Sequence, residues 1–116
     1  MRRNQKQEAV DLLAVHVSAL GQRVEREHRF AQLRHKRQWR FDIAFPDIRV
    51  GVEVQGGVYV QGRHTRGAGV EADYEKFGAA LELGWCVVLC TPRQVKSGQA
   101  LRWVEAAIRL QLGRAA

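Results

Sequence analysis

The spacing of apolar residues predicts alternating helices and strands along the chain. Helical spacing occurs in three stretches, residues 5–20, 70–83 and 98–112. The first two stretches end at Gly21 and Gly84, and glycine commonly terminates a helix. Alternation or a continuous apolar run predicts four strands, over residues 24–33, 40–45, 50–55 and 85–90. The predicted order is α-β-β-β-α-β-α, which is an α/β fold.

The two middle strands form a predicted hairpin with one apolar face. Its apolar positions alternate with small or polar ones and are Phe41, Ile43, Phe45, Val50, Val52 and Val54. A two-residue turn at residues 46–47 would make Asp42 and Glu53 diagonal neighbours, with Cα atoms about 7 to 8 Å apart. A four-residue turn would place them directly opposite one another. In either register Asp42, Glu53 and Gln55 share the face opposite the apolar core. Gly51 leaves space beside them.

The segment between the hairpin and the next helix has no periodicity. Residues 56–69 contain five glycines, which indicates a surface loop. Three of its side chains suit contact with phosphates, namely Arg63, His64 and Arg66. The loop lacks the spacing of a nucleotide-binding motif, so no nucleotide cofactor is expected. The following helix carries an apolar stripe typical of a helix side that faces a core, formed by Tyr74, Phe77 and Leu81.

Length and composition predict a single domain, residues 1–116. Of the 116 residues 46% are hydrophobic and 27% are charged, proportions that fit one folded unit. No apolar run approaches the roughly 18 residues of a membrane span, and the N-terminus lacks the apolar segment of a signal peptide. We therefore expect a cytoplasmic protein without a membrane partner.

The positive charge is concentrated in the first third of the chain. The whole sequence has 19 Lys and Arg against 12 Asp and Glu, a formal net charge of +7. Residues 1–41 contain 10 of these basic residues and 4 of the acids. Such a one-sided distribution favours a polyanion, above all nucleic acid, as the partner over plain solubility. The connector before the hairpin offers candidate phosphate contacts at Arg34, Lys36, Arg37 and Arg40.

Asp42 and Glu53 are the candidate metal ligands. Two carboxylates held close together repel one another unless a cation neutralises them, and oxygen ligands with open positions suit Mg²⁺ or Mn²⁺. On a basic protein, such an ion serves phosphodiester hydrolysis by polarising the phosphoryl group and activating a water. The alternative is that both acids are ordinary outward-facing strand residues.

The element order and the acid spacing resemble the PD-(D/E)XK nuclease superfamily over nearly the whole chain. Arg-Phe-Asp42-Ile-Ala-Phe followed by Val-Glu53-Val-Gln55-Gly-Gly is similar to the metal-binding signature of that family. The resemblance implies a restriction-endonuclease-like core, with a mixed four-stranded sheet flanked by helices. It also implies a third metal ligand on the first helix. Glu8 is the residue placed to match it, although Asp11 lies one turn further along.

The sequence departs from the family pattern in two places. Gln55 stands where the family most often has Lys, and an amide can only orient water or bind a metal through its oxygen. Lys76 is a candidate substitute cation and nucleic-acid contact, and the alternative is a solvated surface lysine. The Pro-Asp pair falls at residues 46–47, in the turn, so Asp42 is assigned to the metal.

The resemblance implies an Mg²⁺-dependent endodeoxyribonuclease of prokaryotic or phage type, similar to small phage or archaeal Holliday junction resolvases and very-short-patch-repair-like nucleases. The expected catalytic residues are Asp42, Glu53, Gln55 and Glu8. Branched DNA is the favoured substrate because the chain has no separate domain for reading bases. A homodimer would provide two matched cuts. The alternatives are a nicking or mismatch-repair endonuclease and a catalytically inactive DNA-binding module of the same fold.

Overall fold

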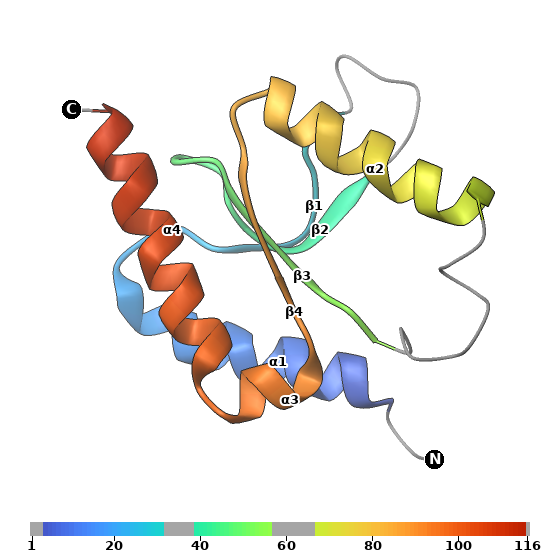
Figure 1. The fold of residues 1–116 in the computed structure, drawn as a ribbon. Helices are drawn as coiled ribbons and strands as arrows, with labels where there is room; N and C mark the ends of the chain where they lie inside the picture. Colours follow the sequence, from blue (N-terminus) through green and yellow to red (C-terminus); the bar gives the residue numbers. More distant parts are fainter. Residues whose placement is uncertain (1–3, 32–38, 57–66, 116) are drawn as a thin grey trace.

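The computed structural model describes residues 4–31, 39–56 and 67–115 as an α/β protein (Figure 1). Its helices and strands are α1 (Gln5–Val17), β1 (Glu25–Arg29), β2 (Arg40–Phe45), β3 (Val50–Val54), α2 (Gly67–Glu82), β4 (Cys86–Cys90), α3 (Pro92–Lys96) and α4 (Gln99–Ala115). They occur in the predicted order, with α3 as an additional short helix and a 3-10 turn (Ser18–Leu20) after α1. None of the described helices is long and apolar enough to cross a membrane.

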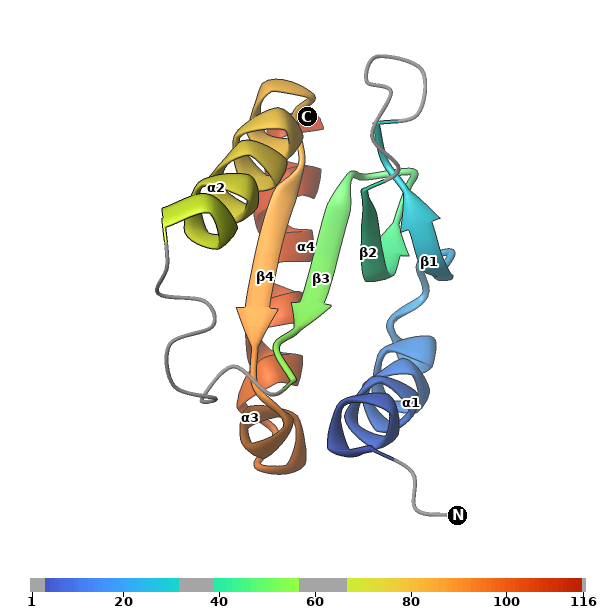
Figure 2. The same cartoon turned by 90° about the vertical axis from the view of Figure 1, so that its right-hand side faces the viewer.

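The four strands form one open mixed sheet in the order β1-β2-β3-β4. β1, β2 and β3 are antiparallel neighbours, and β4 runs parallel to β3. A parallel pair needs a crossover connection, which α2 supplies. Figures 1 and 2 show α2 on one face of the sheet, with α1, α3 and α4 on the other.

Two apolar clusters fill the two faces of the sheet. The larger one joins α1, α3 and α4 to the strands, and its fully buried members include Leu13, Ile43, Phe45, Val52, Val95 and Val104. The smaller one lies beneath α2 and contains Phe41, Ala44, Ala80 and Trp85. Because both faces are covered, a polar side chain within the central strands needs a partner other than bulk water.

The turn between β2 and β3 has four residues, 46–49, and not two. The observed register pairs Ile43 with Val52. Continued along the strands, this register places Asp42 opposite Glu53. The two-residue turn is therefore wrong, and the four-residue alternative describes the hairpin.

Phe41 leaves the face that strict alternation predicts for it. It belongs to the cluster beneath α2, whereas Ile43 and Phe45 belong to the larger core. A Cβ atom at Gly51 would lie 2.4 Å from a carbon of the Phe41 ring. The missing side chain of Gly51 thus makes room for this ring, and the predicted role of Gly51 as a spacer beside the acids is corrected.

The orientation of α2 also differs from the predicted one. Tyr74 and Leu81 are 70% and 74% exposed, so two members of the predicted apolar stripe face solvent. Ala79 and Ala80 are buried instead, and their small side chains let the helix approach the sheet closely. Lys76, one turn before them, lies on the same buried side of the helix.

Candidate active site

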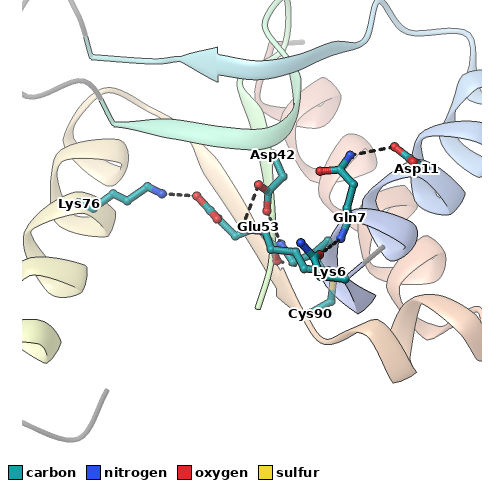
Figure 3. Close-up of polar contacts among 9 residues, drawn as sticks. Lys6, Gln7, Asp11, Asp42, Glu53, Lys76 and Cys90 are labelled. Atoms are coloured by element: carbon teal, nitrogen blue, oxygen red, sulfur yellow. Dashed lines mark hydrogen bonds and ion pairs between the residues drawn. The ribbon is translucent and has the colours of Figure 1, made fainter. Parts of the chain in front are cut away.

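Asp42 and Glu53 lie opposite one another where β2 and β3 separate (Figure 3). Both residues are buried, each with 7% of its surface exposed. The Oδ2 atom of Asp42 accepts a hydrogen bond of 2.7 Å from the backbone N–H of Val54. This bond fixes the Asp42 carboxylate at the end of β3. Two acids buried side by side require positive partners.

Lys76 is the partner of Glu53. Its ammonium group donates a hydrogen bond to Glu53 Oε1, and its side chain is only 17% exposed. The same ammonium lies 5.9 Å from the centre of the Phe41 ring and 5.8 Å from that of Phe77, within the range of cation–π attraction. Lys76 is therefore a site residue, and the alternative of a solvated surface lysine is wrong.

Burial raises the pKa of the Glu53 carboxyl to about 7. Removal from water is the largest cause, because it penalises the charged form. The hydrogen bond and the charge of Lys76 lower this pKa, as does the charge of Lys6, while the charge of Asp42 raises it. An added divalent cation would favour the ionised form of Glu53.

Lys6 is the partner of Asp42, from a helix on the other face of the sheet. Its Nζ atom lies 3.3 Å from Asp42 Oδ1, and its side chain is 44% exposed. The sequence analysis missed this residue. A signal for it exists, because Lys6 precedes the buried Ala9 and Val10 by three and four positions and so lies on the inward side of α1.

Lysine, and not the more common arginine, pairs with both buried carboxylates. Only four of the 19 basic residues are lysines, and they are Lys6, Lys36, Lys76 and Lys96. Two of these four pair with the two buried carboxylates. A lysine ammonium is a compact point charge on a flexible stem, which suits a site where a single oxygen must be contacted. The site thus combines two acids and two ammonium groups from α1, β2, β3 and α2 (Figure 3).

Gln55 directly follows β3 and is half-buried. Its backbone N–H donates a hydrogen bond of 2.7 Å to the Cys90 carbonyl, and the Cys90 thiol donates to the Glu53 carbonyl at 3.7 Å. These contacts tie the end of β3 to the end of β4 and hold Gln55 next to Glu53. Burial raises the pKa of the Cys90 thiol to about 11, so this group stays protonated and does not act as a nucleophile.

The third ligand predicted on the first helix is not brought to the carboxylate pair. Glu8 lies in the first turn of α1 with an exposed side chain, and Lys6 of the same turn approaches Asp42 instead. Asp11 pairs with Arg26 at 2.8 Å. Among the described residues, no group of three or more Asp, Glu, His or Cys could hold a metal ion.

The side-chain oxygens of Asp42 and Glu53 are nevertheless of the kind that a hard divalent cation binds. They offer carboxylate oxygens from adjacent strands, and Mg²⁺ is commonly bound by one or two carboxylates, with water and substrate phosphate at the remaining positions. In the structure Lys6 and Lys76 balance these charges. A metal ion bound by the two carboxylates would neutralise their negative charge together with these lysines or in their place.

Arg40 is the one predicted connector contact within the described residues. It is exposed at the start of β2 and pairs in register with Arg29 of β1, which is exposed as well. Like charges directly opposite one another on a sheet are destabilising, so this pair favours an anionic partner. Lys76, also a predicted nucleic-acid contact, pairs with Glu53. The remaining predicted nucleic-acid contacts lie outside the described residues, and they are Arg34, Lys36, Arg37, Arg63, His64 and Arg66.

Comparison with known proteins adds no relative: no protein-family model, no curated protein and no solved structure matches the chain. The interpretation of the site therefore depends on the geometry and charge of Asp42, Glu53 and their two lysine partners.

Proposed function

We propose that the chain is a metal-dependent endodeoxyribonuclease with a restriction-endonuclease-like core. One observation carries the proposal: Asp42 and Glu53 lie opposite one another and are buried in the central strands of a basic protein. Ordinary outward-facing strand acids would be solvated. Buried ionisable groups cost free energy, and they are concentrated at functional sites.

The arrangement of elements supports the same proposal. A first helix, an antiparallel three-stranded meander, a crossover helix and a fourth strand parallel to the third make up the core that the resemblance to PD-(D/E)XK nucleases implies. Asp42 on β2 and Glu53 on β3 are the residues that match the family's metal-binding signature. Gln55 keeps the third position of that signature without its charge.

In the proposed mechanism, Asp42 and Glu53 would hold one Mg²⁺ or Mn²⁺ ion. Bound there, it would supply the Lewis acidity that polarises a DNA phosphate and activates a water. The Val54 N–H fixes Asp42 Oδ2, so Oδ1 is the oxygen that Asp42 offers to the ion. Gln55 orients the attacking water through its amide.

Lys76 has the role of the positive charge that Gln55 cannot supply. Its ammonium is largely shielded from solvent, pairs with Glu53 and faces the site from α2. A fixed positive charge in a site shielded from water stabilises the negative charge that develops on the phosphate in the transition state. This role gives a function to the lysine on the side of α2 that faces the sheet.

Branched DNA is the proposed substrate, and a homodimer is the proposed assembly. The exposed pair Arg29 and Arg40 suits contacts with the phosphate backbone, which carry no sequence information. A four-way junction needs two matched cuts, and two copies of the chain would provide one site each. A nicking or mismatch-repair endonuclease that acts as a monomer is the alternative within the same chemistry.

A catalytically inactive DNA-binding module is the second candidate function. The observation that favours it is that each carboxylate already has a lysine partner, so the pair is balanced without a metal ion. In that case the four residues would be a structural cluster of ion pairs. The exposed arginines would then carry the function.

A cleavage panel distinguishes these candidates. The purified chain is incubated with Mg²⁺ or Mn²⁺ and with four-way junctions, flaps, nicked duplexes and linear duplexes. We expect the junction to be cut fastest and EDTA to abolish cutting. Fastest cutting of the nicked duplex would support the monomeric alternative. Binding of DNA without cleavage of any form would leave only the binding module.

A further inference from the structure

A hollow of about 360 Å³ lies at the N-terminal end of α1, and one of its lining residues is the lysine that pairs with Asp42. It is lined by Asn4, Gln5, Lys6 and Gly56. A Cβ atom at Gly56 would lie 2.5 Å from the Lys6 Cβ, so a side chain at Gly56 would displace the lysine. The hollow is therefore built around the stem of one lysine, whose ammonium reaches Asp42.

The two lysines of the site differ in how firmly they are held. Lys76 is 17% exposed, donates a hydrogen bond to Glu53 and lies near two aromatic rings. Lys6 is 44% exposed, and its Nζ is 3.3 Å from Asp42 Oδ1. The Lys6 ammonium thus reaches solvent, although its partner Asp42 is buried. Lys76 is thus held firmly at its carboxylate, whereas Lys6 is free to move from Asp42 to another anionic partner.

The two oxygens of Asp42 have different partners. Oδ2 is bound to the Val54 N–H at 2.7 Å, and Oδ1 faces the Lys6 ammonium. A divalent ion held by Asp42 would use Oδ1, because the other oxygen is tied to the backbone. The ion and the ammonium would repel one another at this oxygen. Lys6 must therefore leave when the ion binds, and its stem already lines an open hollow.

We infer that this hollow is a phosphodiester-binding subsite, and that Lys6 moves from Asp42 to a substrate phosphate when a divalent metal ion takes Asp42 Oδ1. The inference rests on the proposed nuclease function and adds a substrate-binding residue to it. A phosphate gives the released ammonium a new anionic partner. Metal and substrate then bind cooperatively, because each favours the same position of Lys6.

The affinity for Mn²⁺, measured by calorimetry at fixed pH, tests the exchange without any cleavage. Lys6→Met removes the competing ammonium. We expect Mn²⁺ to bind at least about two- to fivefold more tightly than to the wild type, because the ion pair between the half-exposed Lys6 and Asp42 no longer has to be broken. Lys96→Met removes the same charge from an exposed position on α3 and should leave the affinity unchanged. An unchanged or weakened affinity in Lys6→Met would overturn the exchange.

Binding of a four-way DNA junction, with Ca²⁺ present or with EDTA, tests the phosphate contact. Lys6→Met should weaken binding severalfold with Ca²⁺ and much less with EDTA, because without an ion Lys6 stays paired with Asp42. Equal losses in both conditions would overturn the inference, since Lys6 would then be a general surface charge. Lys6→Gln should reproduce both effects, and thermal melting shows that each variant is folded.

These outcomes can be separated from those of the nuclease proposal. Cleavage by the wild type without tighter Mn²⁺ binding in Lys6→Met would overturn this inference alone. Tighter Mn²⁺ binding and the Ca²⁺-dependent junction effect, without cleavage, would overturn the nuclease activity and support the exchange. A wild type that binds no Mn²⁺ would overturn both.

Discussion

Lys76 of α2 pairs with Glu53 of β3 on a covered face of the sheet. Glu53 lies opposite Asp42 in the strand register. Asp42 pairs with the ammonium group of Lys6, which comes from α1 on the opposite face. Helices from both sides thus converge on two neighbouring strand residues (Figure 3). This arrangement explains how charged side chains are accommodated between two apolar clusters, because each charged group lies next to a group of opposite charge.

Replacement of either carboxylate should abolish DNA cleavage. Asp42→Asn keeps an acceptor for the Val54 N–H, and Glu53→Gln keeps the side-chain shape, but each removes a negative charge that holds the ion. We expect the cleavage rate to fall by roughly 100-fold or more, while DNA affinity in EDTA changes little. Gel-based cleavage and binding assays measure both. A folded variant with the wild-type cleavage rate would show that the group is not a ligand.

Lys76→Met should lower kcat more than it raises KM, because the buried ammonium acts on charge in the transition state. The expected loss is about 10- to 100-fold in kcat. Gln55→Lys introduces the lysine that the family pattern has at this position, so the single variant should stay active. The double variant Gln55→Lys, Lys76→Met should recover part of the activity that Lys76→Met loses. Lys96→Met is the matched control. Complete inactivity of Gln55→Lys would instead indicate that Gln55 binds the metal.

The stability of the metal-free protein should fall as the pH rises through the pKa of Glu53. This pKa is about 7 in the folded protein, above the ordinary value of 4.5, because the group is buried. Between these values the folded state binds more protons than the unfolded state. The contribution of Glu53 to stability is therefore complete below pH 4.5 and is lost as the pH rises towards and beyond 7.

Denaturant unfolding in EDTA, at several pH values across this interval, measures the effect. The free energy of unfolding of the wild type should decrease with pH more steeply than that of Glu53→Gln, which has no carboxyl to titrate at this position. Parallel curves for the two proteins would contradict the burial of an ionisable Glu53.

Arg29 and Arg40 should contribute to the salt dependence of DNA binding. Each substitution to Gln should flatten the slope of log K against log salt by about 1 and weaken binding to all sequences alike. The same change relieves repulsion between the two strands, so Tm should stay constant or rise. Arg102→Gln, exposed on α4, is the control. An unchanged slope in Arg40→Gln would place the DNA elsewhere.

The strand pattern was sufficient to predict the pair of acids. The strand alternation placed Asp42 and Glu53 close together on neighbouring strands in both registers considered, so the uncertain turn did not matter for the pair. It also predicted that the two acids share one face of the sheet, and this part is not confirmed, because Asp42 pairs with Lys6 of α1 and Glu53 pairs with Lys76 of α2, which cover opposite faces (Figure 2). The helix ends were predictable for a similar reason. Gly21 and Gly84 adopt φ values of 81° and 84°, a conformation that glycine reaches without strain.

The turn itself depends on contacts that sequence spacing does not reveal. Arg49 closes it with a φ of 57°, and its guanidinium donates to the Leu83 carbonyl at 2.7 Å. Gln111 of α4 donates to the carbonyls of Ile48 and Arg49 at 2.9 and 3.1 Å. These tertiary contacts favour the four-residue turn over the local preference of Pro46 and Asp47 for a shorter one.

The pairing of Lys6 and Lys76 with the two carboxylates was not predicted. The side of a helix that faces the sheet depends on tertiary packing, which the sequence pattern does not reveal. The apolar residues Tyr74 and Leu81 suggested one buried side of α2, yet Ala79 and Ala80 face the sheet because they allow a closer approach. That rotation carries Lys76 to Glu53. Phe41 completes the environment by crossing to the α2 face, in the space that Gly51 leaves.

Mn²⁺ titration of the wild type, Asp42→Asn and Glu53→Gln, followed through the EPR signal of the free ion, tests the central claim most directly. Glu8→Gln, run in parallel, shows whether the exposed acid of α1 belongs to the same site. We predict one ion per wild-type chain and loss of this binding in both Asp42→Asn and Glu53→Gln. Equal Mn²⁺ affinity in the wild type and in these two variants would contradict the claim that Asp42 and Glu53 share a metal ion.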